Sequence, residues 1–191
     1  MENEQLNEEL MLAFKEHFMG YKICPRCGSN LVCAPIDNRS RMKCGNPGCD
    51  FVYYNNPVPA AGALVINDGK VLLVRRAHQP KKGWWGLPAG FMEWDEHPAE
   101  TAVREVEEET GLKIKLETLF EVYSGNDDPR TNAILIVYLA TILGGDLRAA
   151  DDAEEVRFFD FGELPENIAF ISNRQALEDY RARIIKNIAF D

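Results

Sequence analysis

The sequence predicts an α+β fold preceded by a small cysteine-containing module. Three observations support this prediction: apolar runs that end in turn residues, a helix with clear start and stop signals in the middle of the chain, and two cysteine pairs near its beginning. With 191 residues, 46% of them hydrophobic and 27% charged, the chain has room for one ordinary domain with a buried core and a small appendage.

Residues 1–20 predict an amphipathic helix. Leu6, Leu10, Phe14 and Phe18 recur every four residues among polar side chains, so they share one helical face. We expect this face to pack on the rest of the chain or on a second copy in a homodimer. The acidic polar face disfavours a membrane surface, and no apolar run approaches the roughly 20 residues that cross a bilayer. Because the start of the chain also lacks the basic and apolar regions of a signal peptide, we expect a cytoplasmic protein.

Residues 21–56 contain four cysteines in two local pairs. Cys24 and Cys27 form a C-x2-C knuckle, and Cys44 and Cys49 form a wider C-x4-C knuckle. Four thiolates in this arrangement suit a tetrahedral structural Zn²⁺ and leave no open coordination position for catalysis. Disulfide bonds are the alternative, which a reducing cytosol disfavours. The segment resembles a zinc ribbon.

The same segment is basic, with five Lys and Arg residues against two Asp, although the whole chain has a net charge of −10. The overall acidity argues against broad electrostatic attachment to nucleic acid. We therefore expect the basic residues to form a solvated surface or a face that docks on the rest of the chain. A role on capped RNA is the alternative.

After the linker at residues 55–57, the sequence pattern changes to strands. The apolar run 60–66, the Asn-Asp-Gly turn and the run 71–75 predict a hairpin. Further strands are expected at 113–123, 133–143 and 156–159. A closing amphipathic helix follows, capped by Ser172 or Asn173, and its apolar face holds Ala176, Leu177, Tyr180 and Ile184.

A helix within residues 90–112 carries a cluster of carboxylates. Pro98 suits its first position, and the glycine at 111 suits its end. Glu105, Glu108 and Glu109 stand at i, i+3 and i+4, so they crowd onto one face and repel one another unless a cation neutralises them. A hard divalent ion with oxygen ligands, Mg²⁺ or Mn²⁺, is the natural candidate, and a solvated acidic face is the alternative.

The whole stretch 90–112 fits the pattern G-x5-E-x7-R-E-U-x-E-E-x-G-U, with U apolar, at every specified position. It resembles a complete Nudix box. The resemblance implies a Nudix hydrolase domain over residues 57–191, built as an α/β/α sandwich around a mixed sheet. It also implies an enzyme that hydrolyses phosphorus-containing anhydrides, cleaving the diphosphate of a nucleoside diphosphate linked to another group.

The resemblance further assigns roles to individual residues. Glu105, Glu108 and Glu109 would be catalytic and would hold the metal, while Glu96 and Arg104 would be structural. Glu155, in the acidic stretch before the last strand, would complete the site or act as the general base. A charged loop edge is the plain alternative for Glu155.

Two arginines are candidates for substrate binding, because a guanidinium pairs bidentately with phosphate. Arg75 and its neighbour Arg76 follow a predicted strand, and we predict Arg75 as the binding residue. Arg130 lies in a polar loop and could reach a ribose or a phosphate. For both positions, ion pairing with the acidic chain is the alternative.

The substrate is indicated by weaker patterns. A zinc ribbon ahead of a Nudix domain resembles the NADH pyrophosphatases, but their Ser-Gln-Pro-Trp-Pro-Phe-Pro signature is missing from this sequence. The Y-S-x-x-x-D-P-R loop at 123–130 resembles small ADP-ribose pyrophosphatases instead. We therefore favour ADP-ribose, cleaved to AMP and ribose 5-phosphate, with NADH, NAD or FAD as alternatives. A nucleotide sensor without catalysis, or a zinc-ribbon RNA-binding protein, are alternatives of another class, and the intact glutamate set weighs against the sensor.

Overall fold

The computed structural model describes residues 21–188, the last three by their backbone alone. The predicted helix at 1–20 lies outside the described residues. The chain divides into two compact units between Asn56 and Pro57, and each is described by itself. Among the described helices, none has both the length and the apolar character needed to cross a membrane.

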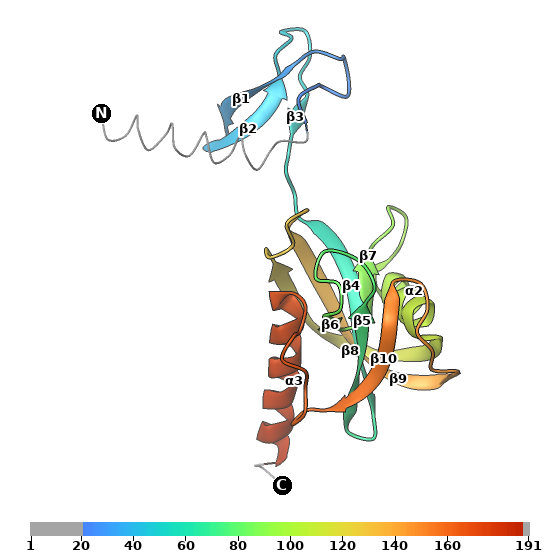
Figure 1. The fold of residues 1–191 in the computed structure, drawn as a ribbon. Coiled ribbons are helices and arrows are strands. Elements are labelled where there is room, and N and C mark those ends of the chain that lie inside the picture. Colours follow the sequence, from blue (N-terminus) through green and yellow to red (C-terminus); the bar gives the residue numbers. More distant parts are fainter. Residues whose placement is uncertain (1–20, 189–191) are drawn as a thin grey trace. The chain divides into compact units, whose positions relative to one another are not determined.

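The first unit contains a small antiparallel sheet in the order β1-β2-β3 (Figure 1). Its strands are β1 (Leu31–Ile36), β2 (Arg39–Cys44) and β3 (Val52–Tyr53). Asp37 and Asn38 join β1 to β2 with positive φ angles of 51° and 59°, which is the backbone of a two-residue hairpin turn. One face of the sheet buries Leu31 and Cys44 together with Cys24.

The second unit is built on a mixed sheet with the strand order β10-β5-β4-β9-β8, in which β4 and β9 run parallel and the other neighbours antiparallel. Short β6 pairs with β5, and short β7 pairs with β4. The predicted strands are all present, and several are longer than predicted. Their bounds are β4 (Val58–Asn67), β5 (Lys70–Arg76), β6 (Trp85–Gly86), β7 (Ala89–Phe91), β8 (Leu112–Gly125), β9 (Ala133–Gly145) and β10 (Ala153–Asp160).

Helices α2 (Pro98–Thr110) and α3 (Ile171–Ile188) cover opposite faces of this sheet (Figure 1). Successive residues of a strand point to opposite faces. Accordingly, Leu64 packs in the core that holds Ala176 and Leu177 of α3, whereas Ala63 and Val65 pack in the core that holds Val106 of α2. This arrangement confirms the predicted α+β fold with helices on both sides of a mixed sheet.

The two helices begin in different ways. Helix α2 begins at Pro98, as predicted, with His97 and Glu100 forming a capping box, and it ends at Gly111, whose φ of 71° is left-handed. The predicted caps of α3 are wrong. Ser172 and Asn173 lie inside its first turn and are buried, and the backbone N–H of Ile171 donates instead to Oδ1 of Asp127, 3.1 Å away.

Candidate active site

A cavity of about 320 Å³ opens in the second unit where α2, the end of β5 and the beginning of α3 meet. Its floor is apolar, with Ala60, Val74 and Leu135 among the lining residues. The charged side chains that line it come from four segments of the chain: Arg76, Arg104, Glu105, Glu108, Glu109, Asp127, Asp128, Arg130, Asp151 and Asp152. The cavity therefore concentrates both carboxylates and guanidinium groups.

Glu109 is the most buried of the charged groups, with 7% of its surface exposed. Its Oε2 accepts a hydrogen bond from the backbone N–H of Ala89 in β7, at 3.1 Å. Burial, together with the negative charge of Glu105, raises the pKa of Glu109 from 4.5 to about 8. Burial also raises the pKa of Glu105, even though Arg104 favours its ionised form. Both carboxyl groups thus lie in a place that disfavours their ionised forms.

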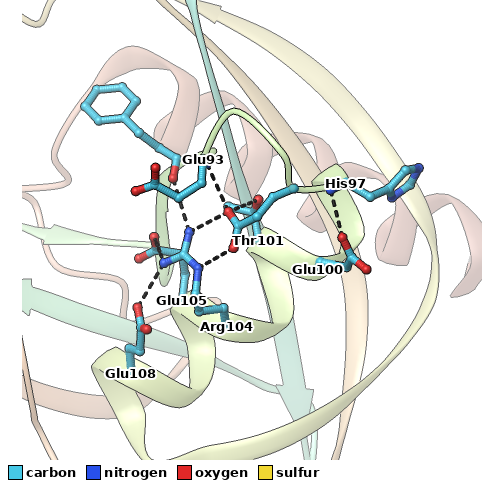
Figure 2. Close-up of polar contacts among 9 residues, drawn as sticks. Glu93, His97, Glu100, Thr101, Arg104, Glu105 and Glu108 are labelled. Carbon is cyan, nitrogen blue, oxygen red and sulfur yellow. Dashed lines mark hydrogen bonds and ion pairs between the residues drawn. The ribbon is translucent and has the colours of Figure 1, made fainter.

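Arg104 organises the neighbouring carboxylates (Figure 2). Its Nη1 donates to Oε1 of Glu105 at 2.6 Å and to Oε2 of Glu108 at 2.9 Å. Its Nε and Nη2 donate to the two oxygens of Glu96, at 2.6 and 2.8 Å, and these bonds lower the pKa of Glu96 to about 2. The predicted structural pair of Glu96 and Arg104 thus anchors two of the three clustered glutamates to the loop before α2.

Gly90 explains how Glu105 reaches the cavity. A side-chain Cβ at this position would lie 2.1 Å from Oε1 and 2.2 Å from Cδ of Glu105, which no real contact allows. The first residue of the predicted box therefore has a packing reason to be glycine: it lets a carboxylate rest against the backbone of β7.

The segment before β10 brings two more acids to the cavity. The N–H of Arg148 donates to the carbonyl of Thr110 at 3.0 Å, and that of Ala150 donates to the carbonyl of Glu109 at 3.2 Å. This segment therefore lies on the C-terminal end of α2, and Asp151 and Asp152, which follow it, line the cavity. The charge of Asp152 is among the causes that raise the pKa of Glu109.

Arg76 lines the cavity, whereas Arg75 does not. Nε of Arg76 donates to the carbonyl of Pro80 at 3.0 Å, and its guanidinium lies 5.1 Å from the ring centre of Phe170. Burial lowers the pKa of Arg76. Within residues 21–188 no carboxylate forms an ion pair with Arg76, so this cation is available to an anionic ligand. Arg75 points to the other side of β5 and pairs with Glu155 at 3.3 Å.

The predicted site residues are thus only partly brought together. Glu105, Glu108, Glu109 and Arg130 all line the cavity, and Glu155 and Arg75 lie outside it. Asp152 and Arg76, which lie close to them in the sequence, line the cavity instead. No signal in the sequence separates Arg75 from Arg76, because the four preceding residues of β5 are all buried and apolar and so hide the alternation of faces.

Arg130 lines the cavity and is also hydrogen-bonded within its own loop. Its Nε donates to Oδ1 of Asp128 at 3.0 Å and its Nη2 donates to Oδ2 at 2.7 Å, and these hydrogen bonds raise the pKa of Arg130. The neighbouring Asp127 pairs with Lys81 at 2.5 Å while it caps α3. Burial alone would raise the pKa of Asp127, but Lys81 and the N–H of Ile171 lower it overall.

The donors in the cavity fit a hard divalent cation. Glu105, Glu108 and Glu109 offer only carboxylate oxygens, which Mg²⁺ and Mn²⁺ prefer. Burial is the largest cause of the raised pKa of Glu109, so its ionised form is disfavoured unless positive charge lies close by. A cation among these oxygens would stabilise the ionised forms, and it would bring positive charge to any phosphate that entered the cavity.

The four cysteines of the first unit lie together. Their sulfur atoms are all within 4.8 Å of one another, with 3.9 Å between Cys24 and Cys49 and 3.3 Å between Cys27 and Cys44. The N–H of Asn46 donates to Sγ of Cys44 at 3.4 Å. Four sulfurs brought together from two knuckles fit tetrahedral Zn²⁺, so the cluster is consistent with the predicted zinc ribbon.

Comparison with known proteins identifies the family. Residues 56–180 match the NUDIX domain. The chain is 43% identical over 128 residues to an ADP-ribose pyrophosphatase from Methanocaldococcus jannaschii, an alignment that covers 66% of this chain and 75% of that protein. It also resembles the crystal structure of a NUDIX hydrolase from Nitrosomonas europaea, with a TM-score of 0.71 and 32% identity over 83% of this chain and 89% of the other.

A second group of relatives shares more of the chain. The chain is 31% identical over 152 residues to the NAD-capped RNA hydrolase NudC from Chromobacterium violaceum, covering 79% of this chain and 54% of NudC. The chain thus spans about half the length of that relative. These comparisons place the chain in the Nudix hydrolase family, as its box predicted. It is a pyrophosphohydrolase.

Proposed function

We propose that the enzyme hydrolyses ADP-ribose to AMP and ribose 5-phosphate, with Mg²⁺ or Mn²⁺ held by Glu105, Glu108 and Glu109. The observation that supports this most is that the three glutamates share one cavity with Arg76 and Arg130. A diphosphate needs positive charge on both of its phosphates, and the arginines can supply what lies beyond the reach of the cation. The 43% identity to an ADP-ribose pyrophosphatase supports the choice of substrate.

In this proposal each group of residues has a separate task. Glu105, Glu108 and Glu109 hold the divalent cation, which supplies positive charge against the diphosphate and makes a water more acidic. Arg104 positions Glu105 and Glu108 through its hydrogen bonds to both. Arg76 binds a phosphate oxygen, and Arg130, kept in place by Asp128, binds the other phosphate or the ribose.

The proton of the attacking water needs an acceptor inside the cavity. We expected Glu155 in this role, but its carboxylate is paired with Arg75 outside the cavity. Asp152 lines the cavity, and its charge acts on both Glu109 and Arg76. We therefore propose Asp152 as the general base.

A pyrophosphatase acting on NADH, NAD or FAD is the second candidate, and one observation favours it. The alignment with NudC covers 79% of this chain, which is more than residues 57–191 can provide, so the similarity extends into the first unit. The ADP-ribose pyrophosphatase alignment, at 66%, does not require that extension. The extent of the alignment therefore favours a NudC-like substrate, while the higher sequence identity, 43%, favours ADP-ribose.

Product analysis separates the two candidates. Purified protein would be incubated with Mg²⁺ or Mn²⁺ on ADP-ribose, NADH, NAD, FAD and dinucleoside polyphosphates, and the products identified by chromatography. AMP and ribose 5-phosphate formed from ADP-ribose well ahead of the other reactions supports the proposal, and faster cleavage of NADH overturns it in favour of the second candidate. In ¹⁸O-labelled water one product should carry the label, because water is the attacking group.

Matched variants test the residue assignments. Arg76→Gln should raise KM for ADP-ribose by about tenfold or more, since a charge-assisted bond to phosphate is lost, and Arg75→Gln should leave KM almost unchanged. Asp152→Asn should lower kcat by a factor of about 10² or more, whereas Glu155→Gln should not. The opposite result would assign phosphate binding to Arg75 in the first pair, or the role of general base to Glu155 in the second.

A further inference from the structure

The sheet of the first unit has an outer face that the catalytic proposal does not use. Opposed residues of antiparallel strands point to the same face, and the register pairs Val32 with Lys43 and Ile36 with Arg39. Arg39, Arg41 and Lys43 therefore share one face, while Cys44 and its partner Leu31 point into the cysteine core on the other face. Tyr54, just after β3, joins the outer face because the Arg41 guanidinium lies 4.6 Å from its ring centre.

This outer face, which we call the basic face, consists of Val32, Arg39, Arg41, Lys43 and Tyr54. No strand position on it is acidic. Within residues 21–188 none of its three cations forms an ion pair, and Asp50, one of the two acids in residues 21–56, pairs instead with Arg26. Val32 is 42% exposed and Tyr54 is 48% exposed. Arg39 and Lys43 are exposed, and Arg41 is half-buried against the ring of Tyr54, so three cations, a half-exposed aromatic ring and an aliphatic side chain share one face.

The charge of residues 21–56 is opposite to that of the rest of the chain. Residues 21–56 contain five Lys and Arg residues and two Asp, which gives them a net charge of +3. Since the whole chain has a net charge of −10, all other residues together carry −13. At physiological ionic strength, charges separated by more than about 8 Å of solvent are largely screened. The local charge of the basic face, rather than the net charge of the chain, therefore decides what binds to it.

We propose that the basic face binds a single-stranded polynucleotide. Alternate residues along β2 are about 6.6 Å apart, so the three cations can follow successive phosphates of an extended strand. The Tyr54 ring and the Arg41 guanidinium beside it offer planar surfaces on which bases stack. An acidic peptide would satisfy the cations but would make no use of the exposed aromatic ring. Such binding is independent of the hydrolytic proposal, which concerns the other unit.

The test is fluorescence anisotropy of a labelled short oligouridylate titrated with the full chain in magnesium-free buffer over a series of salt concentrations. Three phosphate contacts should give a slope of log K against log salt near −2, at about −0.7 for each contact. Arg41→Gln should make this slope shallower by about 0.7. Tyr54→Ala should weaken binding by about fivefold or more through lost stacking. Lys113→Gln, with the same charge change on β8, is the matched control and should bind as the wild type does.

Two results would overturn the proposal. One is the absence of salt-dependent binding by the full chain, which would mean that solvent or the acidic residues of the chain itself satisfy the basic face. The other is binding that Arg41→Gln, Tyr54→Ala and Lys113→Gln change equally. Zinc content and ADP-ribose hydrolysis should be the same in all three variants and the wild type, so that loss of binding cannot be mistaken for misfolding or for failure of the hydrolytic proposal.

Discussion

Neutralising Glu109 should stabilise the metal-free protein while abolishing turnover. Its carboxylate is buried, accepts one backbone hydrogen bond, and has its pKa raised from 4.5 to about 8. Each pKa unit corresponds to about 1.4 kcal/mol, so the ionised form costs the fold roughly 4–5 kcal/mol when no cation is present. Glu109→Gln keeps the shape of the side chain and an oxygen that can accept the N–H of Ala89, but it removes the charge.

The pH dependence has a definite sign. Below about pH 4.5 the carboxyl of Glu109 is protonated in both the folded and the unfolded chain, so it costs nothing. As pH rises from 4.5 to about 8, the unfolded chain releases this proton first, and the free energy of unfolding of the wild type falls. Above about pH 8 the cost is complete. The advantage of Glu109→Gln should therefore be small near pH 5 and largest near pH 9.

Urea unfolding in magnesium-free buffer, followed by tryptophan fluorescence, measures this difference. All three tryptophans of the chain, Trp84, Trp85 and Trp94, lie in the second unit, so the signal reports the unit that contains Glu109. Glu107→Gln makes the same charge change at an exposed position of α2, so its free energy of unfolding should differ little from that of the wild type at either pH. Added Mg²⁺ should stabilise the wild type and not Glu109→Gln.

Two outcomes would refute the reasoning on Glu109. If Glu109→Gln were no more stable than the wild type near pH 9, burial of the charge would not be costly, and the argument for a cation in the cavity would fail. A gain of equal size at both pH values would point to better packing of the amide rather than to the removal of a charge.

Three further substitutions have expected outcomes. Arg104→Lys should lower kcat and destabilise the second unit by about 1–2 kcal/mol in urea unfolding, because a lysine cannot reproduce the paired bonds to Glu96 and the partial exposure of the site limits the loss. Gly90→Ala should reduce kcat by tenfold or more, since a Cβ would collide with Glu105, while Gly144→Ala, where a Cβ meets nothing within 4 Å, should keep activity in the same assay. Cys44→Ser should abolish stoichiometric zinc in elemental analysis, whereas Cys33→Ser, outside the four-sulfur cluster, should retain it.

The parts of the structure that could be predicted from the sequence are those that local chemistry determines. The start of α2 at Pro98, its end at Gly111 and the clustering of its glutamates follow from positions within one helix. The hairpin of β4 and β5 follows from two apolar runs around Asn-Asp-Gly. The two cysteine knuckles are likewise local, and a shared zinc site would require the four sulfurs to lie together, as they do.

The predictions that failed depend on contacts between distant segments. The cap of α3 comes from Asp127, 44 residues before the helix begins, and the residues at the start of the helix give no sign of this distant contact. The choice between Asp152 and Glu155 depends on the residue at which β10 begins and on the irregular register between Ala153 and Glu155. One residue of register moves a side chain to the other face of a sheet, so a correctly recognised motif does not determine which nearby side chain lines the cavity.

The position of the glutamates on α2 adds to the argument for a cation in the cavity. The C-terminal end of a helix carries partial negative charge, which disfavours the carboxylates of Glu108 and Glu109, and the last turn of α2 has no basic residue. Arg104 offsets this on the side of Glu105 and Glu108, whereas Glu109 faces inward and is favoured as an anion by an N–H from β7 and by the more distant charge of Arg76. A divalent cation held among these carboxylates would compensate the negative charge that remains, and without one the ionised form of Glu109 is costly to the fold.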